Sequence, residues 1–250
     1  MATLANAAAG AVRDKLLFAR AGFYRKTAST PALAFAGAPS KVSDMKLFYA
    51  PGACSIGIHA LLEETGKPYE AIRLNLSEGD QRKPEYAAVN PKGKVPALVR
   101  DDGRLLTEFA AIAWWIGLAN PELKLIPQGI DAQAQALSTL SYITGTVHPQ
   151  GFTRMFRPNY FTPHEAEYDA IRALGAENAN KGLAILSQEL GEKSYVAGDL
   201  SVADYALFYV TWWKAFRLKE ELPANLAAHY ARMLARPAVQ RALAAEGFGG

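Results

Sequence analysis

The sequence KLFYAPGACS at residues 46–55 decides the fold of this chain, because a strand ends and a helix begins within it. Residues 46–50 are mostly apolar, as in a short buried strand, and a Pro-Gly pair then breaks the extended pattern. Helical spacing begins at Ser55, so Cys54 lies at a helix N-terminus. Unpaired amide groups and the helix dipole favour a thiolate there, and we expect the pKa of Cys54 to lie below the free value of about 8.5. The alternative is a small, buried cysteine with a structural role.

Cys54 is the only cysteine among the 250 residues. Gly57 occupies the position at which a second cysteine would complete an internal dithiol, so thiol–disulfide chemistry here needs an external thiol. A single cysteine cannot form an intramolecular disulfide, which fits a reducing compartment such as the cytoplasm. Gly57 also costs about 1 kcal/mol relative to alanine inside a helix, and close packing is the one reason that the sequence offers for it.

The segment that follows predicts a thioredoxin-like domain. A helix is expected over 54–65, and alternating apolar and polar residues predict a second strand over 70–76. A strand, a helix and a strand in this order form a βαβ unit with a parallel strand pair. After a polar stretch, residues 95–99 and 104–107 flank an Asp-Asp-Gly turn and predict a hairpin that adds two antiparallel strands.

The second half of the chain is predicted to be all helical. An apolar helix over 108–118 leads into a linker over 121–129, and no convincing strand pattern follows. The predicted fold class is therefore α/β plus all-α, with a thioredoxin-like domain over 45–124 and an all-helical domain over 130–250. The long helices of the second domain are expected over 131–147, 165–191, 201–217 and 224–245.

A capping box marks one helix start in this second domain. Ser201 can bond the amide of Asp204, whose own side chain can reach back, and Leu200 can pack against Tyr205. The motif serves folding rather than chemistry.

Charge separates a leader from the body of the chain. Residues 1–44 contain six lysines or arginines and two aspartates, a net charge of +4, and the remaining residues carry −1. The body therefore lacks a nucleic-acid footprint. The leader is rich in alanine, arginine and serine, and it is either an organelle-targeting presequence, a disordered tail or an upstream extension of the reading frame. No apolar run approaches the roughly 20 residues of a membrane helix, so we expect no membrane partner.

Three motifs, in this order, resemble those of the glutathione transferases. LFYAPGACS at 47–55 is similar to the opening of the bacterial beta class, which has cysteine where other classes have tyrosine or serine. NPKGKVPAL at 90–98 resembles the loop that binds the glutathione backbone, and the box at 201–204 resembles the capping motif of the family. The resemblance covers residues 45–248.

The resemblance implies a glutathione site. Val95 would pair through its main chain with the cysteinyl unit of glutathione, held by a cis peptide bond before Pro96. Glu108 matches the residue that receives the γ-glutamyl ammonium, and the helix start beside it favours the adjoining carboxylate. Phe109 departs from the family, which normally has a small or hydroxylated residue there to bond this carboxylate. Without the resemblance, Pro96 is an ordinary strand-initiating proline and Glu108 a favourable first-turn acid.

His148 matches the beta-class histidine that faces the cysteine across the cleft. A neutral imidazole could accept a proton from a thiol, and an imidazolium would stabilise a thiolate. Alternatively, His148 bonds a carbonyl at a helix end, just before Pro149 breaks the helix. Five aromatic residues could line an apolar electrophile site or simply fill the core: Phe152, Phe156, Trp212, Trp213 and Phe216.

The resemblance implies a cytoplasmic, homodimeric transferase with glutathione as co-substrate. The second substrate is a small electrophile, which would be conjugated, or a disulfide, which would be reduced through a mixed disulfide of Cys54 with glutathione. Two alternatives stay open: a non-catalytic protein-binding module, and a glutathione-dependent dehalogenase or isomerase. No metal is predicted, because one cysteine and four scattered histidines lack ligand spacing.

Overall fold

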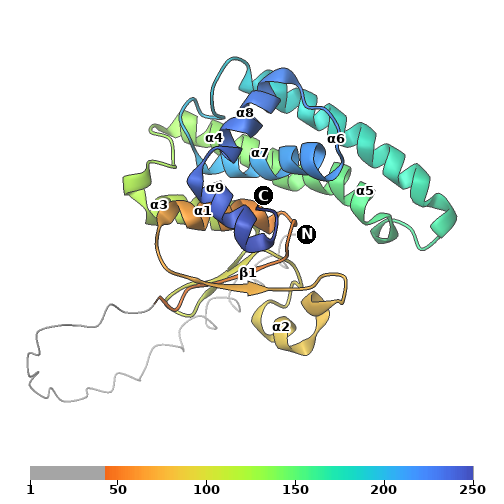
Figure 1. Cartoon of the computed structure of the whole chain (residues 1–250), viewed down its shortest axis with the longest axis horizontal. Helices are drawn as coiled ribbons and strands as arrows, with labels where there is room; N and C mark the ends of the chain where they lie inside the picture. Colours follow the sequence, from red (N-terminus) through yellow and green to blue (C-terminus); the bar gives the residue numbers. More distant parts are fainter. Residues whose placement is uncertain (1–42, 250) are drawn as a thin grey trace, which may run out of the picture. The chain divides into compact units, whose positions relative to one another are not determined.

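Four short strands form a mixed sheet in the order β2-β1-β3-β4 (Figure 1). β1 (Lys46–Tyr49) runs parallel to β2 (Glu70–Arg73) and antiparallel to β3 (Ala97–Val99), which forms a hairpin with β4 (Leu105–Thr107). Helix α1 (Ser55–Thr65) connects the parallel pair. The predicted βαβ unit and hairpin are therefore confirmed, and with them the thioredoxin-like arrangement.

The computed structural model describes residues 43–249. The prediction for a leader over 1–44 falls almost entirely outside the described residues. The described residues belong to one compact unit, so the domain boundary predicted between 124 and 130 stays a prediction. No helix within 43–249 is both long and apolar enough to cross a membrane.

Helices and the loops between them make up most of the rest of the described chain, and Figure 1 shows α1 and α3 between the sheet and the helices of the second half, with α2 apart from them. The following helices precede the long central one: η1 (Asp80–Arg82), α2 (Pro84–Val89), α3 (Phe109–Ala119), η2 (Pro121–Leu123), α4 (Ile130–Tyr142), η3 (Ile143–Phe152), α5 (Thr153–Phe156), η4 (Pro158–Tyr160) and η5 (Glu165–Glu167). The chain then forms α6 (Tyr168–Leu190), α7 (Val202–Trp212), η6 (Trp213–Arg217), α8 (Ala224–Leu234) and α9 (Pro237–Glu246). The prediction of an all-helical second half is confirmed.

The predicted end of the second strand is wrong in detail, and the polar stretch after it contains helices that were not predicted from the sequence. β2 ends at Arg73 rather than at 76: the amide of Leu74 still bonds the carbonyl of Tyr49 at 2.8 Å, but the chain then leaves the sheet edge. The polar stretch over 77–90 contains η1 and α2. Helix α2 buries only Tyr86, so its sequence carries almost no apolar periodicity from which to predict it.

Two helices have bounds that differ from the prediction, and each difference involves a proline. Pro149 does not end the helix predicted over 131–147, because it lies inside η3, a π-helical segment. A π-helical turn already shifts the hydrogen-bond register, so a missing amide interrupts it without ending it. Pro237 instead divides the single helix predicted over 224–245: Arg236 before it is extended, as the clash with a proline ring requires, and α9 begins at the proline.

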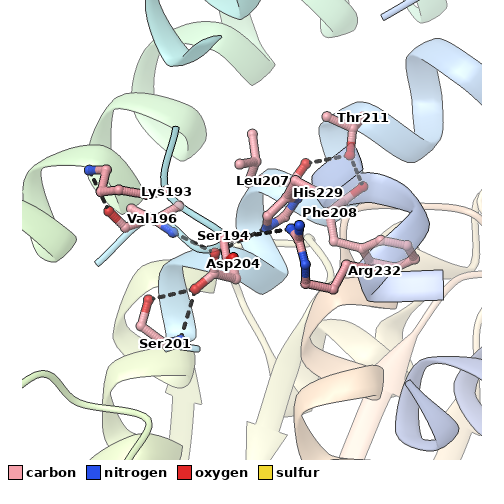
Figure 2. Close-up of polar contacts among 10 residues, drawn as sticks. All are labelled: Lys193, Ser194, Val196, Ser201, Asp204, Leu207, Phe208, Thr211, His229 and Arg232. Carbon is pink, nitrogen blue, oxygen red and sulfur yellow. Dashed lines mark hydrogen bonds and ion pairs between the residues drawn. The ribbon is translucent and has the colours of Figure 1, made fainter. Parts of the chain in front are cut away.

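Both halves of the predicted capping box are present at the start of α7. Asp204 accepts hydrogen bonds from the amide of Ser201 at 2.8 Å and from the amide of Val196 at 2.8 Å, and its Oδ1 lies 3.0 Å from Nε2 of His229 (Figure 2). Asp204 and His229 are fully buried. This network fixes the start of α7, every residue of which is buried. Helix α7 is thus the central support for the elements that carry the cleft.

Gly57 allows α1 to approach α3 and α7 closely. A Cβ at this position would lie 2.6 Å from the carbonyl oxygen of Tyr205 and 2.9 Å from the ring of Phe109. The structure therefore supplies the packing reason for a helix-interior glycine that costs about 1 kcal/mol in propensity.

Candidate active site

One cleft of about 390 Å³ brings together the residues that the sequence singled out for catalysis and for glutathione binding. Its volume falls within the usual range for small-molecule sites. Among the residues that line it are the six predicted for catalysis or glutathione binding: Cys54, Val95, Pro96, Glu108, Phe109 and His148. The peptide bond between Val95 and Pro96 is cis, as the resemblance implied.

Cys54 lies immediately before α1, and neighbouring groups fix the loop that carries it. Its Sγ donates to the carbonyl oxygen of Val95 at 3.6 Å. The amide of Gly52 donates to Oε2 of Glu246 at 2.9 Å, and the carbonyl of Gly52 accepts from Nε1 of Trp213 at 2.8 Å. The loop that carries the thiol is therefore held by contacts from α9 and from η6.

Burial raises the pKa of Cys54 from 9.0 to about 12, so the prediction of a lowered pKa is wrong for the free protein. The amides of Cys54 and Ser55 do lower the pKa, as expected at a helix start, but desolvation of the thiolate outweighs them. The Glu246 carboxylate raises the pKa further. Cys54 is consequently a protonated hydrogen-bond donor at neutral pH.

His148 lies within η3 on the opposite side of the cleft. Its Nδ1 is 3.3 Å from the hydroxyl of Tyr209, and its ring packs at nearly a right angle to that of Trp213, with the ring centres 4.8 Å apart. Burial first, and the nearby charge of Lys94 second, lower the pKa of His148 from 6.5 to about 4. The imidazole is therefore neutral at physiological pH, which disfavours the imidazolium alternative.

Glu108 precedes α3 and faces the cleft with a strained backbone. Its φ of 69° lies in a region that non-glycine residues rarely adopt. Its Oε1 accepts from Nζ of Lys92 at 2.8 Å, and its side chain is 63% exposed. A carboxylate so placed can receive a cationic ligand group.

Phe109 starts α3 and is buried, 6% exposed. Its ring packs 5.1 Å from that of Tyr209 and occupies the space that the missing side chain of Gly57 leaves open. Phe109 therefore has a packing role at the position where the family normally supplies a polar donor.

Comparisons with known proteins agree with this geometry. A family model described as the N-terminal domain of glutathione S-transferase matches residues 52–118. The glutathione S-transferase GstA of Escherichia coli O157:H7 is 39% identical over 211 residues, which are 81% of this chain and 99% of that protein. The chain belongs to the glutathione S-transferase family.

Two solved structures are similar to this transferase over the same region. A bacterial beta class glutathione S-transferase from Sphingomonas chungbukensis is 34% identical, with a TM-score of 0.70 over 81% of this chain and 99% of that one. A sphingomonad glutathione S-transferase complexed with glutathione is 36% identical, with a TM-score of 0.70 over 81% of this chain and 98% of that one.

The cleft of this transferase has two walls. The thiol wall consists of Cys54, Val95, Pro96 and Glu108, and the helical wall consists of His148, Thr153, Phe156, Arg157, Trp213 and Arg217. Of the five aromatic residues proposed to line an electrophile site, only Phe156 and Trp213 do so. Phe152 is fully buried, and Trp212 and Phe216 stack on each other away from the cleft.

Sequence reasoning missed the charged residues of the helical wall. Arg157 and Arg217 lie far apart in the chain and share no motif, so only the packing of α5 beside η6 brings them to one cleft. Lys92 and Lys94 lie in the loop motif at 90–98, where the sequence predicted no role for them, and both line the cleft. Within residues 43–249, no three His, Cys, Asp or Glu side chains are grouped closely enough to hold a metal ion.

Proposed function

We propose that this transferase joins the thiol of glutathione to an electrophilic carbon, with Cys54 as a hydrogen-bond donor to the glutathione sulfur. The observation that carries the proposal is the position of the Cys54 thiol in the cleft, where its Sγ donates to the carbonyl oxygen of Val95 at 3.6 Å. Desolvation raises the pKa of this thiol, which keeps it protonated at neutral pH. A thiol donor stabilises a thiolate acceptor as a hydroxyl donor would. It does so without itself ionising.

The thiol wall supplies the groups that this binding mode requires. Glutathione would lie along the main chain of Val95, with its ammonium at Glu108 and its adjoining carboxylate at the first amides of α3. Lys92 contacts only Oε1 of Glu108 among the described residues, which leaves Oε2 for the ammonium. The similar sphingomonad structure is complexed with glutathione, which supports glutathione as the ligand of this chain.

The reaction would proceed in one displacement. The glutathione thiolate attacks the electrophilic carbon, a thioether bond forms, and the leaving group departs with its electron pair. The thiol proton of glutathione passes to water, because an imidazole with a pKa of about 4 holds it poorly. His148 acts here as a neutral partner: if the hydroxyl of Tyr209 donates to Nδ1, the other ring nitrogen carries a hydrogen for the sulfur.

Thiol–disulfide exchange is the second candidate, favoured by the position of the chain's lone thiol in the cleft. The Cys54 thiolate would attack the glutathione sulfur of a mixed disulfide, release the other thiol, and become glutathionylated. A second glutathione would then attack and leave as oxidised glutathione, restoring Cys54. A thiol with a pKa of about 12 makes the first step slow at neutral pH.

Replacing Cys54 with serine or alanine separates the two roles. With 1-chloro-2,4-dinitrobenzene as the electrophile, we expect Cys54→Ser to retain kcat/KM within about threefold, because a hydroxyl can still donate. Cys54→Ala should lose about ten- to a hundredfold, the effect of one hydrogen bond to a charged group. Reduction of a glutathione mixed disulfide should vanish in both variants if Cys54 is the nucleophile. Equal conjugation rates in Cys54→Ala and the parent would contradict the donor role.

A homodimer and a cytoplasmic location belong to the same proposal. Exposed apolar side chains on α3 and at the first residue of α4 support an interface: Leu118 is 60% exposed and Ile130 is 82% exposed. Sedimentation equilibrium should give twice the chain mass, and a monomer at micromolar concentration would count against the dimer.

A further inference from the structure

The charges that line the cleft are strongly unbalanced. Among residues 43–249, four cationic side chains and one carboxylate, that of Glu108, line the cleft. Lys92 pairs with Glu108, and Lys94 stands next to Val95, where the middle of glutathione would lie. Glutathione carries two carboxylates and one ammonium, so it cannot neutralise the whole cleft. Two cations remain on the helical wall, Arg157 and Arg217.

These two arginines form a cationic pair beside an aromatic surface. The guanidinium of Arg217 lies 4.2 Å from the ring centre of Phe156, which also packs edge-on against Trp213. Arg157 follows α5 directly, and its charge lowers the pKa of Arg217 in addition to the effect of burial. Among the described residues, neither arginine has a carboxylate within ion-pair distance or any hydrogen bond from its side chain. Other arginines, such as Arg236 and Arg241, are paired with glutamates.

We propose that the second substrate is an electrophile with an aromatic or apolar body and an anionic group, a carboxylate or a sulfonate, bound by Arg157 and Arg217. The inference rests on the proposed conjugation. The body of the substrate would pack on Phe156 and Trp213, with the reacting carbon toward the thiol wall. An anion between two guanidinium groups removes their mutual repulsion and accepts charge-assisted hydrogen bonds from both. Arg217, held over Phe156, is already positioned to bind it.

Two electrophiles that share a reacting centre test the proposal. They are 1-chloro-2,4-dinitrobenzene, which is neutral, and 4-chloro-3,5-dinitrobenzoate, which adds a carboxylate. With each rate divided by the uncatalysed rate with glutathione, the parent should favour the benzoate by about tenfold or more. Arg217→Met keeps an apolar chain over Phe156, and Arg157→Met removes the second charge. Each should lower the preference at least about threefold, and the double variant should abolish it.

A control variant separates local contacts from total charge. Arg172→Gln removes one positive charge from an exposed site on α6, outside the cleft, and should leave the preference intact. Arg217→Lys should retain part of it. An equal loss with both electrophiles would overturn the proposal. A raised KM for glutathione with an unchanged preference would also overturn it, because the arginines would then serve a carboxylate of glutathione.

A binding measurement tests the anion site without requiring the proposed conjugation reaction. Calorimetry with unreactive 3,5-dinitrobenzoate and 1,3-dinitrobenzene, each in the presence of S-methylglutathione, should give tighter binding of the benzoate, and this difference should disappear in the double arginine variant. If neither chloro compound is conjugated but the benzoate still binds through the arginines, the proposed reaction fails and the anion site stands. If the two compounds bind equally, the anion site fails.

Discussion

The two walls of the cleft differ in the groups that they present to a ligand. The thiol wall offers a main-chain edge at Val95, one carboxylate and a protonated thiol, all carried by turns next to β1, β3 and β4. The helical wall offers side chains from η3, α5 and η6, among them a neutral imidazole and two arginines. The thiol wall therefore suits a peptide ligand whose structure is constant, whereas the helical wall suits second substrates whose structures vary.

Phe109 lines the cleft and packs against Tyr209, whose hydroxyl lies beside His148 of the helical wall. Replacement of Phe109 should have the largest effect on stability and on glutathione binding. Phe109→Ser removes a buried ring that packs on Tyr209 and over Gly57, so we expect a loss of about 3 to 5 kcal/mol in the free energy of unfolding, measured in urea. The new hydroxyl at the start of α3 should tighten glutathione binding by about tenfold, measured by calorimetry on the folded protein. No gain in affinity would show that the hydroxyl does not reach the bound carboxylate.

Gly57 gives a second test of the same contact. Gly57→Ala forces a Cβ against both the Phe109 ring and the Tyr205 carbonyl. In the Phe109→Ser background only the carbonyl clash remains, so the alanine should cost less there than in the parent. Additive costs would mean that the ring and the glycine do not constrain each other.

The thiol wall could be predicted because its groups lie in contiguous motifs. A strand, a turn and a helix start place Cys54, and the Val-Pro pair and Glu108 follow in short segments with their own turn chemistry. The same local rules failed for the pKa of Cys54, since that pKa depends on burial by the folded chain and on the charge of Glu246, which is far from Cys54 in the sequence. The helical wall was predicted only at His148 and in part of the aromatic set, because side chains from separate helices carry no shared sequence signal.

The free energy of unfolding is expected to depend on pH through His148, the imidazole of the helical wall. Its pKa falls from 6.5 to about 4 on burial, so its contribution to stability is present above pH 6.5 and is lost as the pH falls toward 4. We expect that loss to reach about 3 kcal/mol between these limits. His148→Gln should flatten this part of the stability profile, measured by urea unfolding at each pH. The exposed His164→Gln is the control, and an equal flattening there would contradict the assignment.

The smallest effect of a substitution is expected for Glu246→Gln on the ionisation of Cys54, and it can be read from the single cysteine by mass spectrometry. Because burial raises the pKa of Cys54 to about 12, alkylation by iodoacetamide should accelerate about tenfold per pH unit from about pH 7 to 10, without a plateau. Glu246→Gln keeps an acceptor for the Gly52 amide but removes the charge that raises this pKa, so alkylation at a given pH should be faster. Glu122→Gln, an exposed carboxylate on η2, should change nothing. A plateau below pH 9 in the parent would mean that the helix-start amides outweigh burial, and it would favour Cys54 as the nucleophile of disulfide exchange.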